Sequence, residues 1–589
     1  MKRLPVLAPL AVILSLGLTG LTGCGGGSSS TKTPPPPSIS SFTANSATIT
    51  TGASAALTGV FANGTGVITP GNLPATSGVA VDVSPTATTT YILTVTPASG
   101  TAVTAVTTVT VASAMVSSVT VDHPVGGPAV TDKLLGMNMA IWYDLVTNQT
   151  GIVNAFQSAG ITQVRWPGGS DSDLYHWANN SMCDAGYSDP NDTFANFVSD
   201  MAVPAKLDVA LTANYGSNTT CTAGGDPSEA AAWVTAALNA GITPSHMTVG
   251  NEEYGSWEYD LHSTPNDPTI YADAVVGASG YYQLLKAASP NTLVGIDVDA
   301  DNQSNGWDNI VMHNAMGSYD FVEYHYYPEA PGSESDTFIV QQAAQELTTN
   351  INTLRSELAE WGTANTPIYV GEIGGPYSNP GRQSWSITQG LYAGQVLGEM
   401  MNAGVSRLTW WIGFGNCNGA NGNLSTSLYG WQDFGAYNVF SDGPDEDPTC
   451  PGAGPLGTMS PTARAFQLFS KMAVNGQTAL TTTVVGDPAD VRAYAATNPS
   501  GTAVLLFNDN ENLAQPVTVT VSGKSSSSGV TVTAYDKAIY DQSGSPTGTP
   551  PDVVGTSTWA QPSTTSMGAQ ALPVTLTLTP WSMNVVIIQ

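Results

Sequence analysis

The sequence predicts a multidomain protein: a (β/α)8 TIM barrel with a C-terminal β-sandwich and an N-terminal Ig-like β-sandwich. Over residues 114–477, β-rich runs alternate with helical runs, which is typical of βα units around a parallel barrel. The flanking regions 38–113 and 478–589 contain short β-rich runs separated by turn residues and little helical pattern. A length of 589 residues suits about three folded units of this kind.

The first 37 residues predict export and anchoring. Two basic residues precede an apolar run over 4–21, which is the pattern of a secretory signal peptide covering 1–23. The run ends in Leu-Thr-Gly-Cys, which resembles a bacterial lipoprotein processing site with Cys24 as the lipidated residue. Residues 24–37 are a Gly/Ser/Pro linker. We expect an extracytoplasmic protein that contacts a bacterial membrane only through a lipid anchor at Cys24.

The charge balance excludes one class of partner. Lys and Arg total 15 against 45 Asp and Glu, which gives a net charge of −30 at pH 7. A chain without a basic patch and with this negative surface repels nucleic acid.

The N-terminal region 38–113 favours a spacer domain over a sugar-binding module. Its runs at 90–95 and 106–111 alternate polar and apolar residues as strands do. Aromatic side chains are the usual platforms for sugars, and this region has only Phe42, Phe61 and Tyr91.

Eight β-rich runs predict the strands of the barrel, each followed by a helical run. The strands are expected at 134–141, 163–167, 207–214, 247–252, 293–298, 321–327, 368–372 and 407–412. The helices are expected at 151–159, 193–203, 228–239, 269–288, 307–316, 336–361, 384–403 and 461–474.

The third of these helices has a well-marked start. Asp226 fits the N-cap, Pro227 fits the first turn, and Glu229 lies three residues after the cap. This spacing predicts a capping role for Glu229 rather than a catalytic one.

After residue 478 the pattern is again that of strands alone. Runs are expected at 491–495, 503–507, 517–521, 530–534, 574–578 and 583–588. The run 116–121, just before the barrel, is expected to add a strand to this second sandwich.

Four cysteines remain when Cys24 is set aside. In an oxidising compartment four cysteines allow three pairings. The most local choice joins Cys183 to Cys221 and Cys417 to Cys450. No Cys or His spacing matches a zinc site, and we expect neither a metal nor a cofactor.

Two glutamates end predicted strands four and seven. The runs are Val-Gly-Asn-Glu up to Glu252 and Tyr-Val-Gly-Glu up to Glu372. Residues at the C-terminal ends of barrel strands converge on one pocket. Two carboxylates facing each other there can cleave a glycosidic bond, since one protonates the leaving oxygen and the other attacks or stabilises the sugar cation. Glu253 should point the other way and be structural.

Other polar and aromatic residues at strand ends are candidates for substrate binding. Arg165 can hold a carboxylate by a fork of hydrogen bonds. The Asn251 amide can bind the sugar hydroxyl next to the reacting carbon. His325 or Tyr327 can hydrogen-bond the nucleophile and tune its ionisation. Alternation should turn one of the two tryptophans that end strand eight inward, and Trp411 is our candidate floor for the apolar face of a sugar.

Several of these motifs resemble the clan A glycoside hydrolases, and most closely the family 51 α-L-arabinofuranosidases. The resemblance covers roughly 130–475 and rests on Arg-Trp-Pro-Gly-Gly at 165–169, on 250–258, on His-Tyr-Tyr at 325–327 and on 371–374. It implies a retaining, double-displacement hydrolysis of polysaccharide or oligosaccharide. Glu252 would be the acid/base and Glu372 the nucleophile, supported by Asn251, Arg165 and Tyr327.

The chain departs from the arabinofuranosidase pattern in two strands. Predicted strand one has Asn138 in the region where these enzymes usually place a glutamate that grips the furanose. Predicted strand seven continues Ile-Gly-Gly over 373–375 and lacks their usual Trp-Asn. A clan A glucanase, xylosidase or glucuronidase therefore stays open as an alternative. The non-enzyme alternative is a glycan-binding surface lipoprotein.

Overall fold

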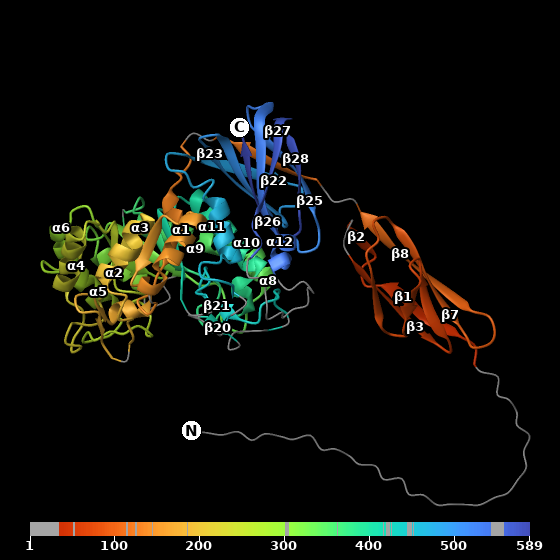
Figure 1. The fold of residues 1–589 in the computed structure, drawn as a ribbon, viewed down its shortest axis with the longest axis horizontal. Helices are drawn as coiled ribbons and strands as arrows, with labels where there is room; N and C mark the ends of the chain where they lie inside the picture. The colour runs from red at the N-terminus through yellow and green to blue at the C-terminus, as the bar shows by residue number, and fades with distance from the viewer. Residues whose placement is uncertain are drawn as a thin grey trace, which may run out of the picture. The chain divides into compact units, whose positions relative to one another are not determined.

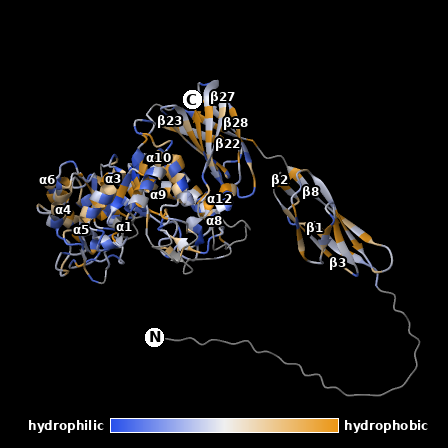
Figure 2. Ribbon diagram, viewed as in Figure 1, coloured by the Kyte–Doolittle hydropathy of each residue, from blue (hydrophilic) through white to orange (hydrophobic). Residues whose placement is uncertain are grey.

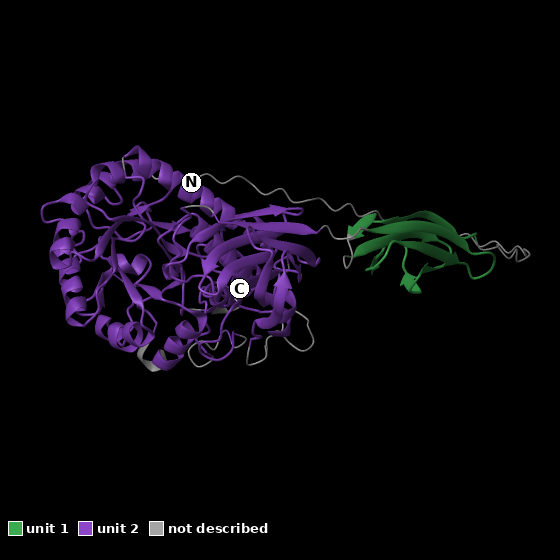
Figure 3. Ribbon diagram, turned by 90° about the horizontal axis from the view of Figure 1, so that it is seen from above, with its two compact units in different colours: residues 1–49, 54–111 green, residues 50–53, 112–589 purple. Residues whose placement is uncertain are grey.

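The structure is a computed structural model. It describes residues 35–50, 54–112, 116–123, 126–143, 145–184, 186–300, 306–361, 363–415, 417–419, 425, 427–443, 450, 453–543 and 559–589. The expected signal peptide, Cys24 and nearly all of the linker lie outside these residues. The chain forms two compact units, one of residues 1–49 and 54–111 and one of residues 50–53 and 112–589 (Figure 3).

The first unit is a β-sandwich, as expected. Its two sheets have the strand orders β1-β3-β6 and β2-β8-β7-β4-β5. Alternate residues of each strand point inward, and Leu57, Leu93 and Val95 are fully buried. Phe42 and Tyr91 also belong to this core, so Phe61 is the one partly exposed aromatic ring among its described residues. The strands are β1 (Ser38–Ala44), β2 (Thr48–Thr50), β3 (Ala55–Ala62), β4 (Thr65–Thr69), β5 (Leu73–Ala75), β6 (Ala80–Val83), β7 (Thr89–Thr96) and β8 (Val103–Ala112).

The second unit contains the barrel, and all eight expected strands are confirmed. They close in sequence order, each parallel to its neighbours. Because every strand runs the same way, all eight C-terminal ends open on one face. The strands are β10 (Gly136–Asn138), β11 (Gln163–Trp166), β14 (Asp208–Ala213), β15 (His246–Val249), β16 (Leu293–Val298), β17 (Phe321–Tyr326), β18 (Ile368–Ile373) and β19 (Arg407–Trp410).

The helices surround these strands. The helix expected at 193–203 is continuous, with a π-helical stretch over Phe197–Ala202 between two short α-helical pieces. Two other expected helices are each divided in two. The expectation of one helix over 269–288 is wrong, since the chain breaks at Gly277 and Gly280, residues that disfavour a helix interior. The run at 336–361 is interrupted at Gln342. The helices are α1 (Leu145–Ala159), α2 (Phe194–Asn196), α3 (Val203–Ala205), α4 (Pro227–Asn239), α5 (Pro268–Val276), α6 (Tyr281–Ala288), α7 (Trp307–Asn314), α8 (Asp336–Gln341), α9 (Ala343–Glu360), α10 (Ile387–Asn402) and α11 (Pro461–Phe469).

A nine-stranded sheet forms the C-terminal sandwich, and in Figure 2 its strands carry hydrophobic bands between paler polar ones. The strand expected at 116–121 is confirmed as β9 (Ser117–Asp122), which lies between β22 and β25. Val119 and Val121 of this strand join the core of the sandwich. The other strands are β22 (Ala479–Val485), β23 (Val491–Asn498), β24 (Gly501–Asn508), β25 (Gln515–Val521), β26 (Ser526–Asp536), β27 (Ser563–Ala571), β28 (Val574–Leu578) and β29 (Ser582–Ile588). A short helix, α12 (Lys537–Ser543), was not expected.

The sandwich and the barrel share one hydrophobic core. Tyr494, Phe507 and Met583 on the outer face of the sheet belong to the same buried cluster as the barrel. They face α10 and α11, which lie beside the sheet in Figure 1. Two glycines of α10 permit this approach, since a Cβ at Gly394 would lie 2.9 Å from Phe507 and one at Gly398 would lie 2.5 Å from Tyr494.

Both expected disulfides are confirmed in the local pairing. Cys183 is joined to Cys221, and Cys417 is joined to Cys450, with Cα–Cα distances of 5.6 and 6.2 Å. Among the described helices, none has the length and apolar character needed to cross a bilayer.

Candidate active site

A cavity of about 900 Å³ lies at the C-terminal ends of the barrel strands. Both glutamates singled out in the sequence line it, together with an unusual number of aromatic rings. Trp257 and Tyr377 are the most exposed of these, at 66% and 60%. The lining residues are Trp142, Gly169, Ser170, Asn251, Glu252, Tyr254, Trp257, His325, Tyr327, Glu372, Tyr377, Trp411, Ile412 and Tyr437.

Glu252 and Glu372 meet in this cavity, although only Glu372 is part of a strand. Glu372 is the last residue but one of β18. The expectation that Glu252 ends strand four is wrong, because β15 stops at Val249 and the chain then turns with positive φ at Gly250 (78°) and Glu252 (51°). One carboxylate oxygen of each glutamate and a ring nitrogen of His325 lie within 4.8 Å of one another.

Arg165 is buried at the end of β11 and contacts four polar neighbours, namely Glu372, Glu323, Asn251 and Asn138. Its Nη1 donates to Glu372 Oε1 at 2.9 Å, and its Nε lies 2.7 Å from Glu323 Oε1. Its Nη2 donates to Asn251 Oδ1 at 2.8 Å. Burial alone would lower the pKa of Arg165, but the charges of Glu323 and Glu372 raise it, so the guanidinium stays charged.

His325 is placed between carboxylates. Its Nδ1 lies 2.9 Å from Glu252 Oε1 and 3.9 Å from Glu372 Oε1, and its Nε2 lies 3.1 Å from Glu323 Oε1. Burial would lower the pKa of His325, but these three carboxylates raise it to about 10. At neutral pH the ring is therefore an imidazolium that donates both N–H groups. Of the two residues expected as alternatives to hydrogen-bond Glu372, His325 is not the one that does so, since its ring bonds Glu252 instead.

The imidazolium keeps Glu252 ionised. Burial acts to raise the pKa of Glu252, but the hydrogen bond and charge of His325 outweigh it and lower that pKa. Trp257 Nε1 adds a second hydrogen bond of 2.9 Å to Glu252 Oε2. The Glu252–His325 pair thus shares one proton, and the pKa directions of the two groups place that proton on the ring.

Tyr327 hydrogen-bonds Glu372, as the sequence suggested. Its hydroxyl donates to Glu372 Oε2 at 2.6 Å. Burial and the Glu372 charge raise the pKa of Tyr327 well above its usual value, so the phenol keeps its proton. With Arg165 on Oε1 and Tyr327 on Oε2, both oxygens of Glu372 are held.

Trp411 is the inward tryptophan at the end of β19, whereas Trp410 is buried against Tyr392 and Phe466. Asn138 does not line the cavity. Its Nδ2 donates to the carbonyl of Gly371 at 2.9 Å, and its Oδ1 accepts from Arg165 Nη1 at 3.1 Å. Asn138 therefore helps to position Arg165 and the backbone of β18, and it offers no carboxylate to a ligand.

Glu323 is a site residue that the sequence analysis did not identify. It is buried in β17, two residues before His325. Burial acts to raise the pKa of Glu323, but the charge of Arg165 and the hydrogen bond from His325 lower it. The available signal was the strand period, since residues two apart point to the same face and Glu323 shares the inward face of His325.

Glu258 was also missed. Its Oε1 accepts hydrogen bonds from Ser170 Oγ at 2.9 Å and from Asn251 Nδ2 at 3.1 Å. Burial, with the nearby charges of Asp173 and Glu252, raises the pKa of Glu258 to about 9. This carboxyl is therefore neutral at pH 7, and it orients the Asn251 amide from the side opposite Arg165.

Glu253 points away from the cavity. It is fully buried beside Asp173, and burial followed by the Asp173 charge raises the pKa of Glu253 well above its usual value. Asp173 in turn accepts the backbone N–H of Asn251 at 3.0 Å. The pair anchors the turn that carries Asn251 and Glu252.

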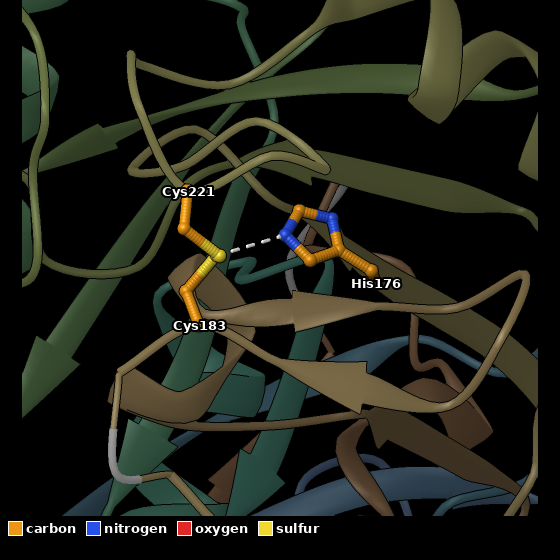
Figure 4. Close-up of side chains that lie close together, drawn as sticks. All are labelled: His176, Cys183 and Cys221. Carbon is orange, nitrogen blue, oxygen red and sulfur yellow. Dashed lines mark hydrogen bonds between the residues drawn. A yellow bond between two sulfur atoms is a disulfide. The ribbon is translucent and has the colours of Figure 1, made fainter.

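Glu229 does not complete the expected capping box. The N-cap side chain of Asp226 accepts from Ser228 N at 2.8 Å, as a cap should. The Glu229 carboxylate instead lies 3.1 Å from His176 Nδ1, whose other nitrogen lies 3.2 Å from Cys183 Sγ. Figure 4 shows this ring beside the Cys183–Cys221 bridge, whose sulfurs are bonded to each other and so are not thiolate ligands for a metal.

The group Glu252, His325 and Glu372 is spaced closely enough to hold a metal ion. A histidine must be neutral to bind a metal, and the raised pKa of His325 opposes this. The arrangement instead suits proton transfer next to a fixed carboxylate.

Several buried carboxyls lead us to predict greater stability in mild acid. Burial is the main cause that raises the pKa of Glu258 to about 9, of Glu329 to about 7 and of Asp509 to about 7. In an unfolded chain such groups ionise at about pH 4. Between these values the folded state binds more protons than the unfolded state, so stability falls as pH rises.

The melting temperature should therefore be higher near pH 5.5 than at pH 8. The pKa of His246, lowered to about 2 by burial and Arg407, acts oppositely, because the unfolded chain gains that proton below about pH 6.5. This places the maximum in mild rather than strong acid. Calorimetry at constant ionic strength checks the prediction, and a melting temperature that rises from pH 5.5 to 8 would contradict it.

No model of a known protein family matches the sequence, and no curated protein is significantly similar to it. Solved structures share its fold at low sequence identity. The α-L-arabinofuranosidase of Thermotoga maritima, in complex with arabinose, aligns with a TM-score of 0.60 and 16% identity over 80% of this chain and 100% of that one. The family 51 arabinofuranosidase of Xanthomonas axonopodis pv. citri aligns with a TM-score of 0.61 and 16% identity, over 81% of this chain and 100% of that one. A family 44 xyloglucanase of Paenibacillus polymyxa aligns with a TM-score of 0.52 and 12% identity, over 80% of this chain and 100% of that one.

Proposed function

We propose that this chain is a retaining glycoside hydrolase, with Glu372 as nucleophile and Glu252 as acid/base. The observation that carries the proposal is the approach of a Glu252 and a Glu372 carboxylate oxygen to within 4.8 Å. Retaining enzymes hold their two carboxyl groups about 5–5.5 Å apart, whereas inverting enzymes need about 6.5–9.5 Å to admit a water. A fold shared with two kinds of glycosidase, arabinofuranosidases and a xyloglucanase, supports the same reaction class.

In the first step, Glu372 attacks the anomeric carbon and the bond to the leaving oxygen breaks. Arg165 and Tyr327 hold the nucleophile in place, so little reorganisation precedes attack. The leaving oxygen takes a proton from Glu252. The product of this step is a glycosyl ester of Glu372.

The position of His325 links proton supply to bond formation. The Glu372 charge is the largest cause that raises the pKa of His325. As Glu372 forms its ester that charge disappears, the ring becomes less basic, and its Nδ1 proton passes to Glu252 along their 2.9 Å hydrogen bond. The net result is one proton delivered to the leaving group and a neutral ring.

The second step reverses these changes. Glu252, now a carboxylate, takes a proton from a water that attacks the anomeric carbon, and the ester bond to Glu372 breaks. The returning Glu372 charge draws the proton back to His325. Each displacement inverts the anomeric carbon, because the incoming group attacks the face opposite the departing one, and two inversions restore the original configuration of the sugar.

The cavity fits a sugar beside this pair. The rings of Trp142, Trp411 and Tyr437 line the cavity and supply apolar surface of the kind that sugars stack on. Asn251 Nδ2 has two N–H groups, and among the described residues it gives only one, to Glu258, so we assign the other to the hydroxyl next to the reacting carbon.

Within this class we propose an α-L-arabinofuranosidase-like activity on polysaccharide or oligosaccharide. Two of the structures with this fold are described as arabinofuranosidases. The buried amide at Asn138 keeps the alternatives open, namely a glucanase, a xylosidase or a glucuronidase.

A panel of aryl glycosides tests the function and its specificity together. We expect release of the phenol from the α-L-arabinofuranoside above the xyloside, glucoside and glucuronide. Faster hydrolysis of another glycoside of the panel would change the proposed sugar, while the proposed reaction, glycoside hydrolysis, would stand. Binding of polysaccharide with no hydrolysis of any member at any pH would identify a glycan-binding lipoprotein instead.

We place the enzyme outside the cytoplasm of a bacterium, tethered by a lipid at Cys24. The basis is the leader sequence together with two disulfides, which persist in oxidising compartments.

A further inference from the structure

A second cavity, of about 470 Å³, lies in the large unit away from the barrel mouth. Its walls come from α1, from α11, from the loop before α11 and from the chain that follows residue 558. None of its lining residues belongs to the catalytic cavity. Arg464 lines it while being only 3% exposed.

Arg464 is a buried cation without a carboxylate partner among the described residues. Its Nη1 bonds two neutral acceptors, Gln467 Oε1 at 3.0 Å and Met459 Sδ at 3.1 Å. Its Nε has no acceptor within the part of the chain that the structure describes. By contrast, the buried Arg165 and Arg407 and the half-buried Arg492 are each paired with a carboxylate.

Such a cation is costly to bury, because removal from water is not repaid by a counter-charge. The chain has three times as many acidic as basic residues, 45 against 15, yet no described carboxylate approaches this guanidinium. Burial lowers the pKa of Arg464, which reflects the same missing charge. An anion from outside would satisfy the site.

The remaining lining residues indicate what else that anion carries. Asn154, Gln467 and Gln561 offer amides, and Ser158 and Thr458 offer hydroxyls. Leu456 and Met459 add an apolar wall. A volume of about 300–1,000 Å³ is usual for small-molecule sites, so the space admits a whole sugar ring rather than a bare ion.

We propose that this cavity binds a uronic acid, with the sugar carboxylate on Arg464 and its hydroxyls on the surrounding amides. Arginine suits this role because its planar donors match a carboxylate. The site would bind uronic acid units of a polysaccharide at a distance from Glu252 and Glu372. Binding in this cavity does not depend on hydrolysis.

Calorimetric titration of the full chain with glucuronate and galacturonate tests the proposal. The native protein should bind a uronate saturably and the neutral sugars glucose and galactose at least tenfold more weakly. Arg464→Met should abolish uronate binding. Lys471→Met, which removes an exposed cation just after α11, should bind as the native protein does.

A second variant guards against a folding defect in Arg464→Met. Gln467→Glu places a carboxylate beside Arg464 Nη1, so it should raise the melting temperature and also abolish uronate binding. Glu372→Ala should retain uronate binding, which separates this cavity from the catalytic one. Uronate binding that is lost in Glu372→Ala but kept in Arg464→Met would overturn the proposal. Binding of sulfate and acetate as tight as that of the uronates would also overturn it.

Discussion

Replacement of Glu372 with alanine is expected to reduce hydrolysis of the best aryl glycoside by on the order of 10⁴-fold or more, because no group remains to form the covalent intermediate. The fold should persist, since Arg165 keeps Glu323 and Asn251 as partners. Initial rates with native and variant protein, alongside circular dichroism spectra, check this result.

Glu360→Ala is the matched control for that substitution. Glu360 is an exposed carboxylate at the end of α9, and its loss should leave the rate unchanged. Full activity of Glu372→Ala would show that the reaction does not pass through this carboxylate.

Replacement of Glu252 with alanine should have an effect that depends on the leaving group. General acid catalysis raises the reaction rate by about 10²- to 10⁴-fold, and a sugar leaving group depends on this full contribution. A dinitrophenyl group departs without a proton, so its release from the enzyme-bound substrate should slow far less. The ester on Glu372 should then accumulate, because no base activates water.

Azide provides the control for Glu252→Ala. A small anion fits the space left by the carboxylate and attacks the ester without base assistance, so turnover should recover and yield a glycosyl azide of unchanged configuration. An equal loss for both leaving groups, with no response to azide, would remove the acid/base role from Glu252.

The barrel and the meeting of two glutamates could be predicted because both follow from local pattern. Alternating strands and helices dictate a parallel ring, and a parallel ring brings strand ends together. The position of Glu252 could not be predicted to the residue, since the turn that carries it depends on left-handed φ values at Gly250 and Glu252.

The charge states of the site residues could not be predicted from the sequence for a different reason. Glu323 and His325 are two residues apart, but the third partner, Arg165, is remote in the chain and reaches them only through the closed barrel. Glu229 shows the same limit, because its capping position was evident and its His176 partner was not. Which carboxyl is charged is decided by such distant neighbours and by burial.

Trapping of the covalent intermediate is the most direct test of Glu372 as the nucleophile. A 2-deoxy-2-fluoro glycoside of the preferred sugar with a dinitrophenyl leaving group slows both steps, and the good leaving group still allows the first. Peptide mass spectrometry should then find one sugar attached to Glu372 in the native protein and none in Glu372→Ala. Attachment at another residue, or turnover of ordinary substrate by a protein that never becomes labelled, would contradict it.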